Sequence, residues 1–502
     1  MNEKSGKSFR KMQYIRECQS LDELIEQLSF HMGNTQDLVT VKVQFADKES
    51  VIIYLESTTD TNQLEKTFEW LTNVYWASDE PTETLRIAQV ERGQTLDDTA
   101  KKILLGDTYL FSMEQGSWIT YKIGSPLVLQ RAIQEPKNEQ IVRGAHAGFN
   151  ENIITNLYQV RSRLKSPHLV IRYFTIGELS QTKCALLYLD HVANPMIIEE
   201  ITMRLQSINT DVSFSIGTIE EYIEDDNFSP FPQLLNTERP DRVVGNLAEG
   251  RFALLLDGSP TSLIAPVNFF AFYQSPDDYN GRFMVGTFYR LLRIASFLIA
   301  LLLPAIYIAI ISFHFEIIPQ DITLPTKRAI EDIPYPPLFE ALLLELTIEL
   351  IREAGIRLPN PIGQTIGIVG GLVIGDAVVN AGFISNIMII VVALTAISSF
   401  VVPSVEMNTT VRILRFPFMI LASLFGFFGV AIGLIILTIH LIRLESMCTP
   451  YLSPFAPFHL TAVKDMFLRF PAWNQTQRPA DAMPINKKRH GKNRWWKHER
   501  KK

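Results

Sequence analysis

The chain has 502 residues, of which 47% are hydrophobic and 20% are charged, and its formal net charge is -6. A chain of this length predicts roughly two to four domains rather than one core. Its three cysteines, Cys18, Cys184 and Cys448, are odd in number and far apart, which excludes a disulfide framework and a cysteine-based zinc site. The polar N-terminus has no apolar signal core, so we expect no secretion signal.

Residues 1–134 are predicted to form a first α/β unit, because alternating and amphipathic segments follow a short basic arm. The predicted elements are helices over 21–30, 64–75 and 96–105, strands over 38–45 and 51–55, and a hairpin over 109–123. This mixture of helices and strands indicates a compact N-terminal α/β subdomain.

Residues 135–285 are predicted to form a second α/β subdomain, which begins with a linker over 135–149. The predicted elements are helices over 150–164, 195–208 and 219–223, and strands over 168–175, 184–191 and 251–256. Asn150 is expected to cap the first of these helices. Pro195 stands at the first position of the second helix, where proline is tolerated.

Residues 286–445 are predicted to form a transmembrane helical domain because they contain long apolar runs. The runs cover 294–313, 362–380, 387–402 and 416–439. About 20 apolar residues cross roughly 30 Å of hydrocarbon, and several such runs close together argue against buried core helices. The expected fold is therefore a soluble α/β N-terminal region of two subdomains followed by an α-helical transmembrane bundle. Residues 446–502 form the expected C-terminal cytoplasmic basic tail.

Basic residues near the apolar runs predict the orientation, because cytoplasmic flanks are rich in Lys and Arg. The first run is preceded by Arg282, Arg290 and Arg293. Residues 487–502, after the last run, are strongly basic as well. Two cytoplasmic flanks require an even number of crossings, which four runs satisfy. Arg412 and Arg415 would then lie on the opposite side, which counts against this orientation.

An amphipathic acidic helix is predicted over 338–354, between the first two runs. Glu345, Glu349 and Glu353 fall at i, i+4 and i+8 and therefore share one face. Two interpretations stay open. The helix either lies at the membrane interface or lines a wet cavity, where in an oligomer its acidic face would form a vestibule that concentrates cations.

The run over 362–380 has two distinct faces. Glycines that recur at every fourth residue allow close helix packing in a membrane; they are Gly363, Gly367, Gly371 and Gly375. The face predicted to line a pore consists of Ile366, Val369, Val373, Asp376 and Asn380. In one interpretation its apolar residues gate by dewetting and Asp376 forms a cation-attracting ring. In the other, Asp376 lies near the interface and hydrogen-bonds a neighbouring helix.

The sequence contains no phosphate-binding loop, dinucleotide fingerprint, metalloprotease motif or nucleophile elbow, so we expect no enzymatic activity, cofactor or metal site. The scattered histidines are interpreted as structural or incidental; they are His146, His168, His191, His314, His440 and His459. For the tail, with Trp495 and Trp496 among its basic residues, binding to anionic lipid, binding to nucleic acid and a flexible solubilising role all stay open.

Several long stretches resemble the A subunit of the GerA-type nutrient germinant receptors of bacterial spores. These stretches are residues 135–169, 229–260, 272–283, 303–319 and 338–397. In the first stretch many relatives continue after Val-Arg-Gly with Pro or Ser and then Arg. This chain has Ala145, His146 and Ala147 there, so a subunit contact made by that arginine must differ.

The resemblance implies an integral membrane protein of the spore inner membrane, and the basic flanks imply a cytoplasmic N-terminal region and C-terminal tail. The implied partners are a transporter-like B subunit, a lipoprotein C subunit, membrane lipids and further copies of this chain in a ring expected to be a pentamer. No nucleic-acid partner is expected. The implied function is a nutrient-gated cation channel that triggers germination. The alternative is a non-conducting receptor or scaffold subunit that binds nutrient or partners.

Overall fold

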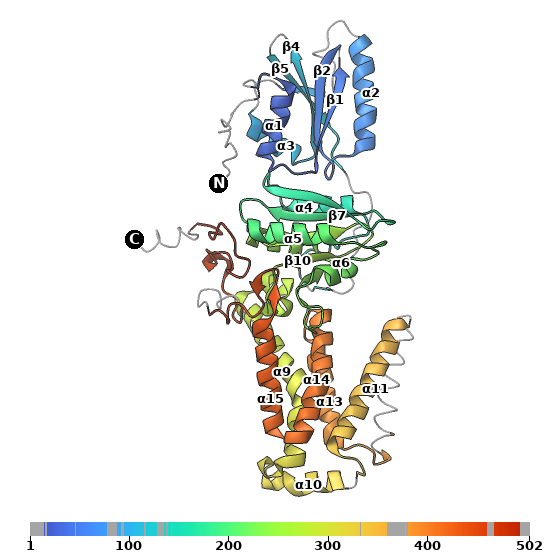
Figure 1. Cartoon of the computed structure of the whole chain (residues 1–502), viewed down its shortest axis with the longest axis vertical. Helices are drawn as coiled ribbons and strands as arrows, with labels where there is room; N and C mark the ends of the chain where they lie inside the picture. The colour runs from blue at the N-terminus through green and yellow to red at the C-terminus, as the bar shows by residue number, and fades with distance from the viewer. Residues whose placement is uncertain are drawn as a thin grey trace, which may run out of the picture.

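A computed structural model of the chain describes residues 15, 18–45, 47–77, 88–91, 95–114, 117–127, 135–136, 139–141, 143–331, 333–358, 377, 380–458 and 466–491. Two α/β units and a helical region follow one another along the long axis of the molecule (Figure 1). The C-terminal segment returns to lie beside the second α/β unit (Figure 1). The second α/β unit therefore lies at one end of the helical region, and no described residue of either α/β unit lies at the other end.

The first unit is a five-stranded antiparallel sheet with helices on both faces, in the strand order β1-β2-β4-β5-β3. Its elements are α1 (Leu21–His31), β1 (Leu38–Phe45), β2 (Lys48–Leu55), α2 (Thr61–Ala77), β3 (Ala88–Glu91), α3 (Leu96–Ile103), β4 (Asp107–Glu114) and β5 (Ser117–Gly124). Alternation along β2 places Val51 and Ile53 in the core with α1 and α3, whereas Ile52 packs with Leu64 of α2. Each predicted element of this unit is confirmed, and β3 has no counterpart among them.

The second unit repeats this plan in the strand order β6-β7-β9-β10-β8. Its elements are α4 (Ile153–Arg163), β6 (Leu169–Ile176), β7 (Thr182–Leu189), α5 (Pro195–Ser207), α6 (Ile216–Ile223), β8 (Leu235–Thr237), α7 (Pro240–Glu249), β9 (Phe252–Leu256) and β10 (Ser262–Ala265). Helices α4 and α7 cover one face of the sheet and α5 and α6 cover the other. The predicted cap of α4 is wrong by two residues. Asn152, not Asn150, accepts the hydrogen bond from the Thr155 amide, at 3.0 Å.

A buried ion pair joins the two α/β units. The carboxylate of Asp37, in the turn before β1, accepts hydrogen bonds from the Ser57 amide at 3.0 Å and hydroxyl at 2.7 Å. It also lies 3.1 Å from the guanidinium of Arg161 on α4, and neither side chain has any solvent exposure. Nearby, the Gln36 amide donates to the Ile171 carbonyl on β6 at 3.0 Å, so the turn also covers the edge of the second sheet.

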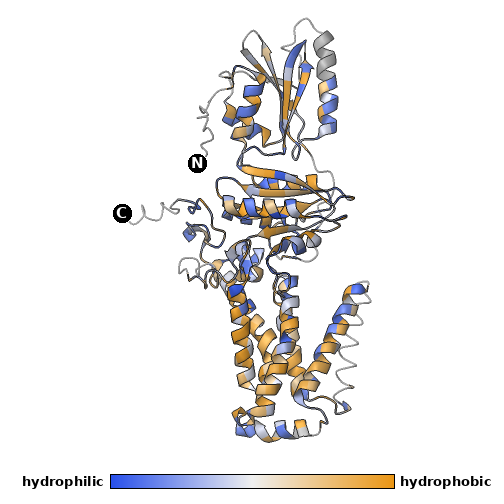
Figure 2. Cartoon of the chain, in the orientation of Figure 1, coloured by the Kyte–Doolittle hydropathy of each residue, from blue (hydrophilic) through white to orange (hydrophobic). Residues whose placement is uncertain are grey.

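The helical region consists of α8 (Pro276–Asn280), α9 (Phe283–Phe313), α10 (Gln320–Glu331), α11 (Pro337–Arg357), α13 (Asn386–Phe400), α14 (Val405–Phe425) and α15 (Phe427–Arg443). Helices α9, α13, α14 and α15 pack side by side, whereas α10 crosses the end distant from the α/β units (Figure 1). Helix α11 starts near α10 and leans away from the bundle toward its C-terminal end (Figure 1). Apolar residues dominate these helices, in contrast to the mixed α/β units (Figure 2).

Within the described residues, one helix is long and apolar enough to cross a membrane by length and composition, and it is α9. At 1.5 Å per residue its 31 residues span about 46 Å. Helices α13 and α15 are apolar but shorter, with 15 and 17 residues. The first predicted run, 294–313, therefore corresponds to the C-terminal two thirds of α9.

The single span predicted over 416–439 is wrong, because the chain turns back at Gly426. This residue has φ +60° and ψ -139°, a backbone conformation that glycine adopts without strain, and it separates α14 from α15. Two further glycines let the antiparallel helices touch. A Cβ on Gly429 would lie 1.9 Å from the Leu421 carbonyl oxygen, and one on Gly433 would lie 2.8 Å from the Phe418 ring. Among the described helices, five therefore run along the bundle: α9, α11, α13, α14 and α15.

Candidate functional site

Most of the predicted pore residues lie outside the described part of the chain. These are Ile366, Val369, Val373 and Asp376 of the pore face and Gly363, Gly367, Gly371 and Gly375 of the packing face. Asn380 is described, and it is an exposed helical residue just before α13. Their roles as pore-lining and helix-packing residues stay predictions.

The acidic residues of α11 are described, and they have different surroundings. Glu345 is buried and contacts the guanidinium of Arg415 on α14. Glu349, one turn further, contacts the guanidinium of Arg412 on the same helix. Glu353 is exposed and pairs with Arg357 on α11 itself, at 2.6 Å. The predicted common face thus turns its first two carboxylates toward arginines of a neighbouring helix and its third toward solvent.

Arg415 also completes the backbone hydrogen bonding of α9. Pro304 lies inside α9 and has no N–H to donate to the Ala300 carbonyl four residues earlier. The Arg415 Nε atom donates to this carbonyl at 3.1 Å, while its other side meets Glu345. One buried guanidinium therefore ties α14 to α9 through a proline-released carbonyl and to α11 through a carboxylate.

A third arginine extends this cluster toward α13. The Arg352 guanidinium carbon lies 4.3 Å from the centroid of the Phe400 ring, a cation–π distance. It donates to the Ser399 hydroxyl at 3.4 Å and lies 4.0 Å from the Glu349 carboxylate. We call Glu345, Glu349, Arg352, Arg412 and Arg415 the inter-helix charge cluster.

The inter-helix charge cluster is not electrically balanced. If all five groups are ionised, three guanidinium groups face two carboxylates, which leaves one positive charge. Buried atoms of the cluster without a hydrogen-bond partner among the described residues are Glu345 Oε1, Arg352 Nε, Arg412 Nε and Arg415 Nη2. Unsatisfied buried polar atoms cost about 1–3 kcal/mol each, so the contacts among the described residues do not fully compensate the burial of this cluster.

Polar contacts connect the upper ends of these helices to the second α/β unit. The Thr410 hydroxyl of α14 donates to the Pro230 carbonyl, and the Ser229 hydroxyl lies 2.8 Å from His440 Nε2 of α15. Both contacts involve the loop between α6 and β8. A movement of this loop therefore acts on the same helix that carries Arg412 and Arg415.

A small cavity of about 250 Å³ lies at the same junction. Its wall includes Glu139, Asn236 and Arg242 from the soluble region and Ser404 and Glu406 from the start of α14. The Arg242 guanidinium contacts the Glu139 carboxylate. The cavity has these polar side chains in a largely apolar wall and lies directly against the N-terminal end of α14, so an occupant would contact both regions.

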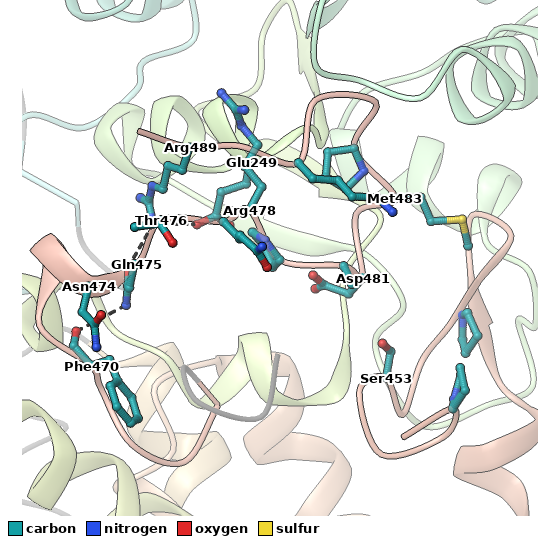
Figure 3. Close-up of a pocket in the computed structure, with 17 residues that line it drawn as sticks. Glu249, Ser453, Phe470, Asn474, Gln475, Thr476, Arg478, Asp481, Met483 and Arg489 are labelled. Carbon is teal, nitrogen blue, oxygen red and sulfur yellow. Dashed lines mark hydrogen bonds and ion pairs between the residues drawn. The ribbon is translucent and has the colours of Figure 1, made fainter. Parts of the chain in front are cut away.

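A larger cavity, of about 930 Å³, lies between the second unit and the C-terminal segment (Figure 3). Arg478 crosses it and donates to the Ala248 carbonyl at 2.7 Å, while Gln475 accepts from Arg489 at 3.0 Å. Buried Asp481 pairs with Arg251 at 2.6 Å. The predicted basic tail therefore packs on the second unit through Arg478, Asp481 and Arg489, whereas Arg469 binds the Tyr279 and Gly281 carbonyls next to α9. These charged groups already bind one another, and we assign them to the attachment of this segment.

Sequence reasoning missed the arginine partners of the acidic helix. The signal was present in the spacing, because Arg412 and Arg415 are three residues apart in an apolar segment and Glu345 and Glu349 are four apart. On two antiparallel helices, guanidinium and carboxylate groups at these spacings can form two successive ion pairs. The Pro304 position was visible too, but its effect on Ala300 depends on a helix more than 100 residues away.

Comparisons with known proteins agree on one family. The family described as Bacillus/Clostridium GerA spore germination protein matches residues 26–481. Spore germination protein GerLA of Bacillus cereus is 40% identical over 472 residues, which cover 92% of this chain and 95% of that protein. An uncharacterized membrane protein of Bacillus subtilis (strain 168), YfkQ, is 42% identical over 398 residues, covering 79% and 77%.

A solved structure is also similar in sequence. It is the crystal structure of the N-terminal domain of the A subunit of the Bacillus megaterium spore germinant receptor GerK3, with 26% identity and a TM-score of 0.37. It covers 50% of this chain and 96% of that chain. The family match spans most of the sequence, from the first α/β unit through the helices to the C-terminal segment. This chain belongs to the Bacillus/Clostridium GerA spore germination protein family.

Proposed function

We propose that this chain is the A subunit of a nutrient germinant receptor in the spore inner membrane, and that copies of it assemble into a nutrient-gated cation channel. The family match over most of the chain supports the receptor role. The observation that carries the channel role is the inter-helix charge cluster, in which buried charges hold α11 against α14. The proposed partners are the B and C subunits, further copies of this chain in a ring of five and membrane lipids. We propose no enzymatic activity.

The surface of the helical region supports a membrane environment. Helix α9 is long and apolar enough to cross a bilayer. Large apolar side chains are also exposed on the surrounding helices, and they include Ile390, Ile397, Phe400, Leu424, Phe428, Ile435 and Ile436. An apolar surface of this extent on one chain requires lipid or partner helices to cover it. The α/β units and the C-terminal segment share one end of this apolar region, which is consistent with a cytoplasmic location for both (Figure 2).

Helix α11 is the element proposed to move. Its buried residues are Glu340, Ala341, Leu344 and Glu345, all in its first half. The second half has no buried residue, and Glu349 and Arg352 provide its polar contacts with α13 and α14. Because removing one partner of a buried ion pair typically costs about 3–5 kcal/mol, the buried Glu345–Arg415 pair favours the arrangement seen here, and the partly exposed Glu349–Arg412 pair adds less.

A nutrient signal would reach α11 through α14. The Thr410 and Ser229 contacts join the loop after α6 to α14 and α15, so a shift of the second unit displaces the arginines that bind α11. A partner or nutrient moves this equilibrium only by binding the open arrangement more tightly than the closed one. The predicted constriction at Val369 and Val373 would then widen and fill with water.

Cation flux through proteoliposomes that contain the purified chain tests this proposal. We expect a ring rather than a monomer in detergent, and a raised cation leak when Glu345→Gln frees α11 from Arg415. Arg357→Gln is the matched control, because its pair with Glu353 is exposed and holds α11 to nothing else. Val369→Ala with Val373→Ala should also raise the leak. A monomer in detergent, or a leak that none of these changes alters, would overturn the channel proposal.

A non-conducting scaffold is the second candidate, and one observation favours it. Glu345 and Glu349 pair with arginines of the same chain and are therefore not free to concentrate cations. If this role is correct, Asp376→Asn should leave germination-linked cation flux unchanged while removal of the chain abolishes it. A changed ion selectivity in Asp376→Asn would exclude the scaffold role.

A further inference from the structure

The open end of the β6–β7 hairpin brings together three side chains that can bind a metal. The register pairs Leu169 with Leu189, so the next residues outward, His168 and Asp190, are cross-strand neighbours. The Asp190 amide donates to the His168 carbonyl at 3.1 Å, which extends the ladder to this pair. His191 follows Asp190 directly, in the turn that leads to α5.

The donor atoms of these side chains converge. His168 Nδ1 lies 3.1 Å from Asp190 Oδ1, and His191 Nδ1 lies 3.4 Å from the same oxygen. The two imidazole rings are 4.4 Å apart between centroids, and all three ligand atoms lie within 4.8 Å of one another. Two ligands at 2.0–2.2 Å from one tetrahedral ion are about 3.3–3.5 Å apart, so the two contacts to Asp190 already approach this spacing.

The ligand set selects a class of ion. Two imidazole nitrogens and one carboxylate oxygen suit Zn²⁺, Co²⁺, Ni²⁺ or Cu²⁺, whereas Mg²⁺ and Ca²⁺ prefer oxygen ligands only. Without a metal, an Nδ1–H of either ring can donate to the Asp190 carboxylate, and a bound ion would take the place of that proton. The side chains are 49%, 37% and 41% exposed for His168, Asp190 and His191, so a further position stays open to water.

This position in the fold gives the site a structural consequence. Gly33, in the turn after α1, lies close enough that a Cβ there would be 3.2 Å from Asp190 Oδ2. Two residues beyond Asp190, the Val192 carbonyl accepts from the Ile485 amide of the C-terminal segment at 2.9 Å. The first unit, the second unit and the C-terminal segment therefore meet around the hairpin end.

We propose that His168, Asp190 and His191 form a site for one divalent transition-metal ion, with Zn²⁺ the best-suited ion, which fixes the hairpin end where these three segments meet. The site is independent of the channel function and of the charge cluster. It also departs from the expectation that the scattered histidines are structural or incidental, because the β6–β7 register brings two of them together.

Co²⁺ and Zn²⁺ binding to the purified, untagged full-length chain tests the proposal. Equilibrium dialysis should give one tightly bound ion per chain, and Co²⁺ should develop the intense visible absorption of a tetrahedral site that Zn²⁺ then removes. His168→Ala and His191→Ala should each weaken binding by more than the ~10–100-fold loss typical of outer-shell changes. All three side chains are on the surface, so the variants should keep the thermal unfolding profile of the metal-free protein.

The basic tail supplies the control, because it contains His490 and His498. The double variant His490→Ala with His498→Ala should bind the metal as the unmodified chain does. Binding that disappears in this variant and persists in His168→Ala with His191→Ala would overturn the proposal. The absence of stoichiometric binding to the unmodified chain would overturn it as well.

Discussion

Replacement of Asp37 by asparagine tests whether one buried ion pair holds the two α/β units together. Asp37 receives two hydrogen bonds from Ser57 and lies 3.1 Å from Arg161, and both charged side chains are completely buried. Asparagine keeps the shape but leaves the Arg161 charge buried without compensation. Such a loss costs about 3–5 kcal/mol, a large part of the 5–15 kcal/mol that stabilises a typical domain.

Thermal unfolding of the full-length protein in detergent measures this effect. For units of about 150–250 residues each kcal/mol corresponds to roughly 2–4 °C, so Asp37→Asn should lower the transition of the α/β region by about 6–20 °C. Limited proteolysis should show cleavage between the two units at lower temperature. The double variant Asp37→Asn with Arg161→Met should recover part of the loss, because no unpaired charge stays buried.

Asp22→Asn is the matched control, since Asp22 pairs with Lys42 at 2.7 Å on the surface of the same unit. Exposed pairs contribute about 0–1 kcal/mol, so this change should shift the transition by a few degrees at most. Equal effects of Asp37→Asn and Asp22→Asn would refute the reasoning from burial. Strictly additive losses in the Asp37 and Arg161 double variant would refute it too.

Three further changes have defined outcomes. Gly429→Ala should destabilise the helical region by about 1–3 kcal/mol in thermal unfolding, because the new Cβ would lie 1.9 Å from a backbone oxygen of α14. Gly245→Ala is the control: a Cβ there has no heavy atom within 4 Å, so this change should be neutral or slightly stabilising. Burial raises the pKa of Glu224 from 4.5 to about 7, so the folded state holds a proton that the unfolded state has lost, and wild-type stability should fall as pH rises from 4.5 to 7. Glu224→Gln should reduce this fall, to which partly buried Glu220 with its raised pKa also contributes, and exposed Glu221→Gln should not, as followed by the transition temperature at several pH values. Asn194→Ala should cost about 1 kcal/mol of α/β stability through loss of the α5 cap, and no loss would contradict the capping bond.

Local patterns predicted most of the α/β elements, because each pattern reports directly on burial, but helix α7 was not predicted. Alternation along 51–55 became β2, with successive side chains in two different cores, and the capped segment at Pro195 became α5. Short strands such as β8 were missed because three residues carry too little periodicity. The cluster of His168, Asp190 and His191 was missed for a different reason: His168 and His191 are 23 positions apart, and only the β6–β7 register makes them neighbours.

Hydropathy did not predict the turn at Gly426, because the residues of this turn are themselves apolar. Residues 416–439 are apolar without interruption, so a window average cannot distinguish one long helix from two helices joined at Gly426. The distinguishing signal is conformational, since Gly426 takes a positive φ and Gly429 and Gly433 permit backbone contact just beyond it. In the sequence, the spacing of these glycines fits a helix-packing face as well as a turn.

Contacts that the sequence does not report also explain why Arg412 and Arg415 conflicted with the predicted membrane orientation. Taken as isolated basic residues, they indicated that their flank lies on the cytoplasmic side, because arginines near apolar runs normally lie in cytoplasmic loops. In the fold each guanidinium has a carboxylate of α11 opposite it, and Arg415 has the Ala300 carbonyl released by Pro304 as well. Arginines with such partners do not require a cytoplasmic flank, so they no longer count against the orientation. The contacts of Arg415 can be tested instead. Pro304→Ala restores the backbone N–H that the Ala300 carbonyl lacks, and it should loosen Arg415 from α9 while leaving its ion pair with Glu345 of α11 in place.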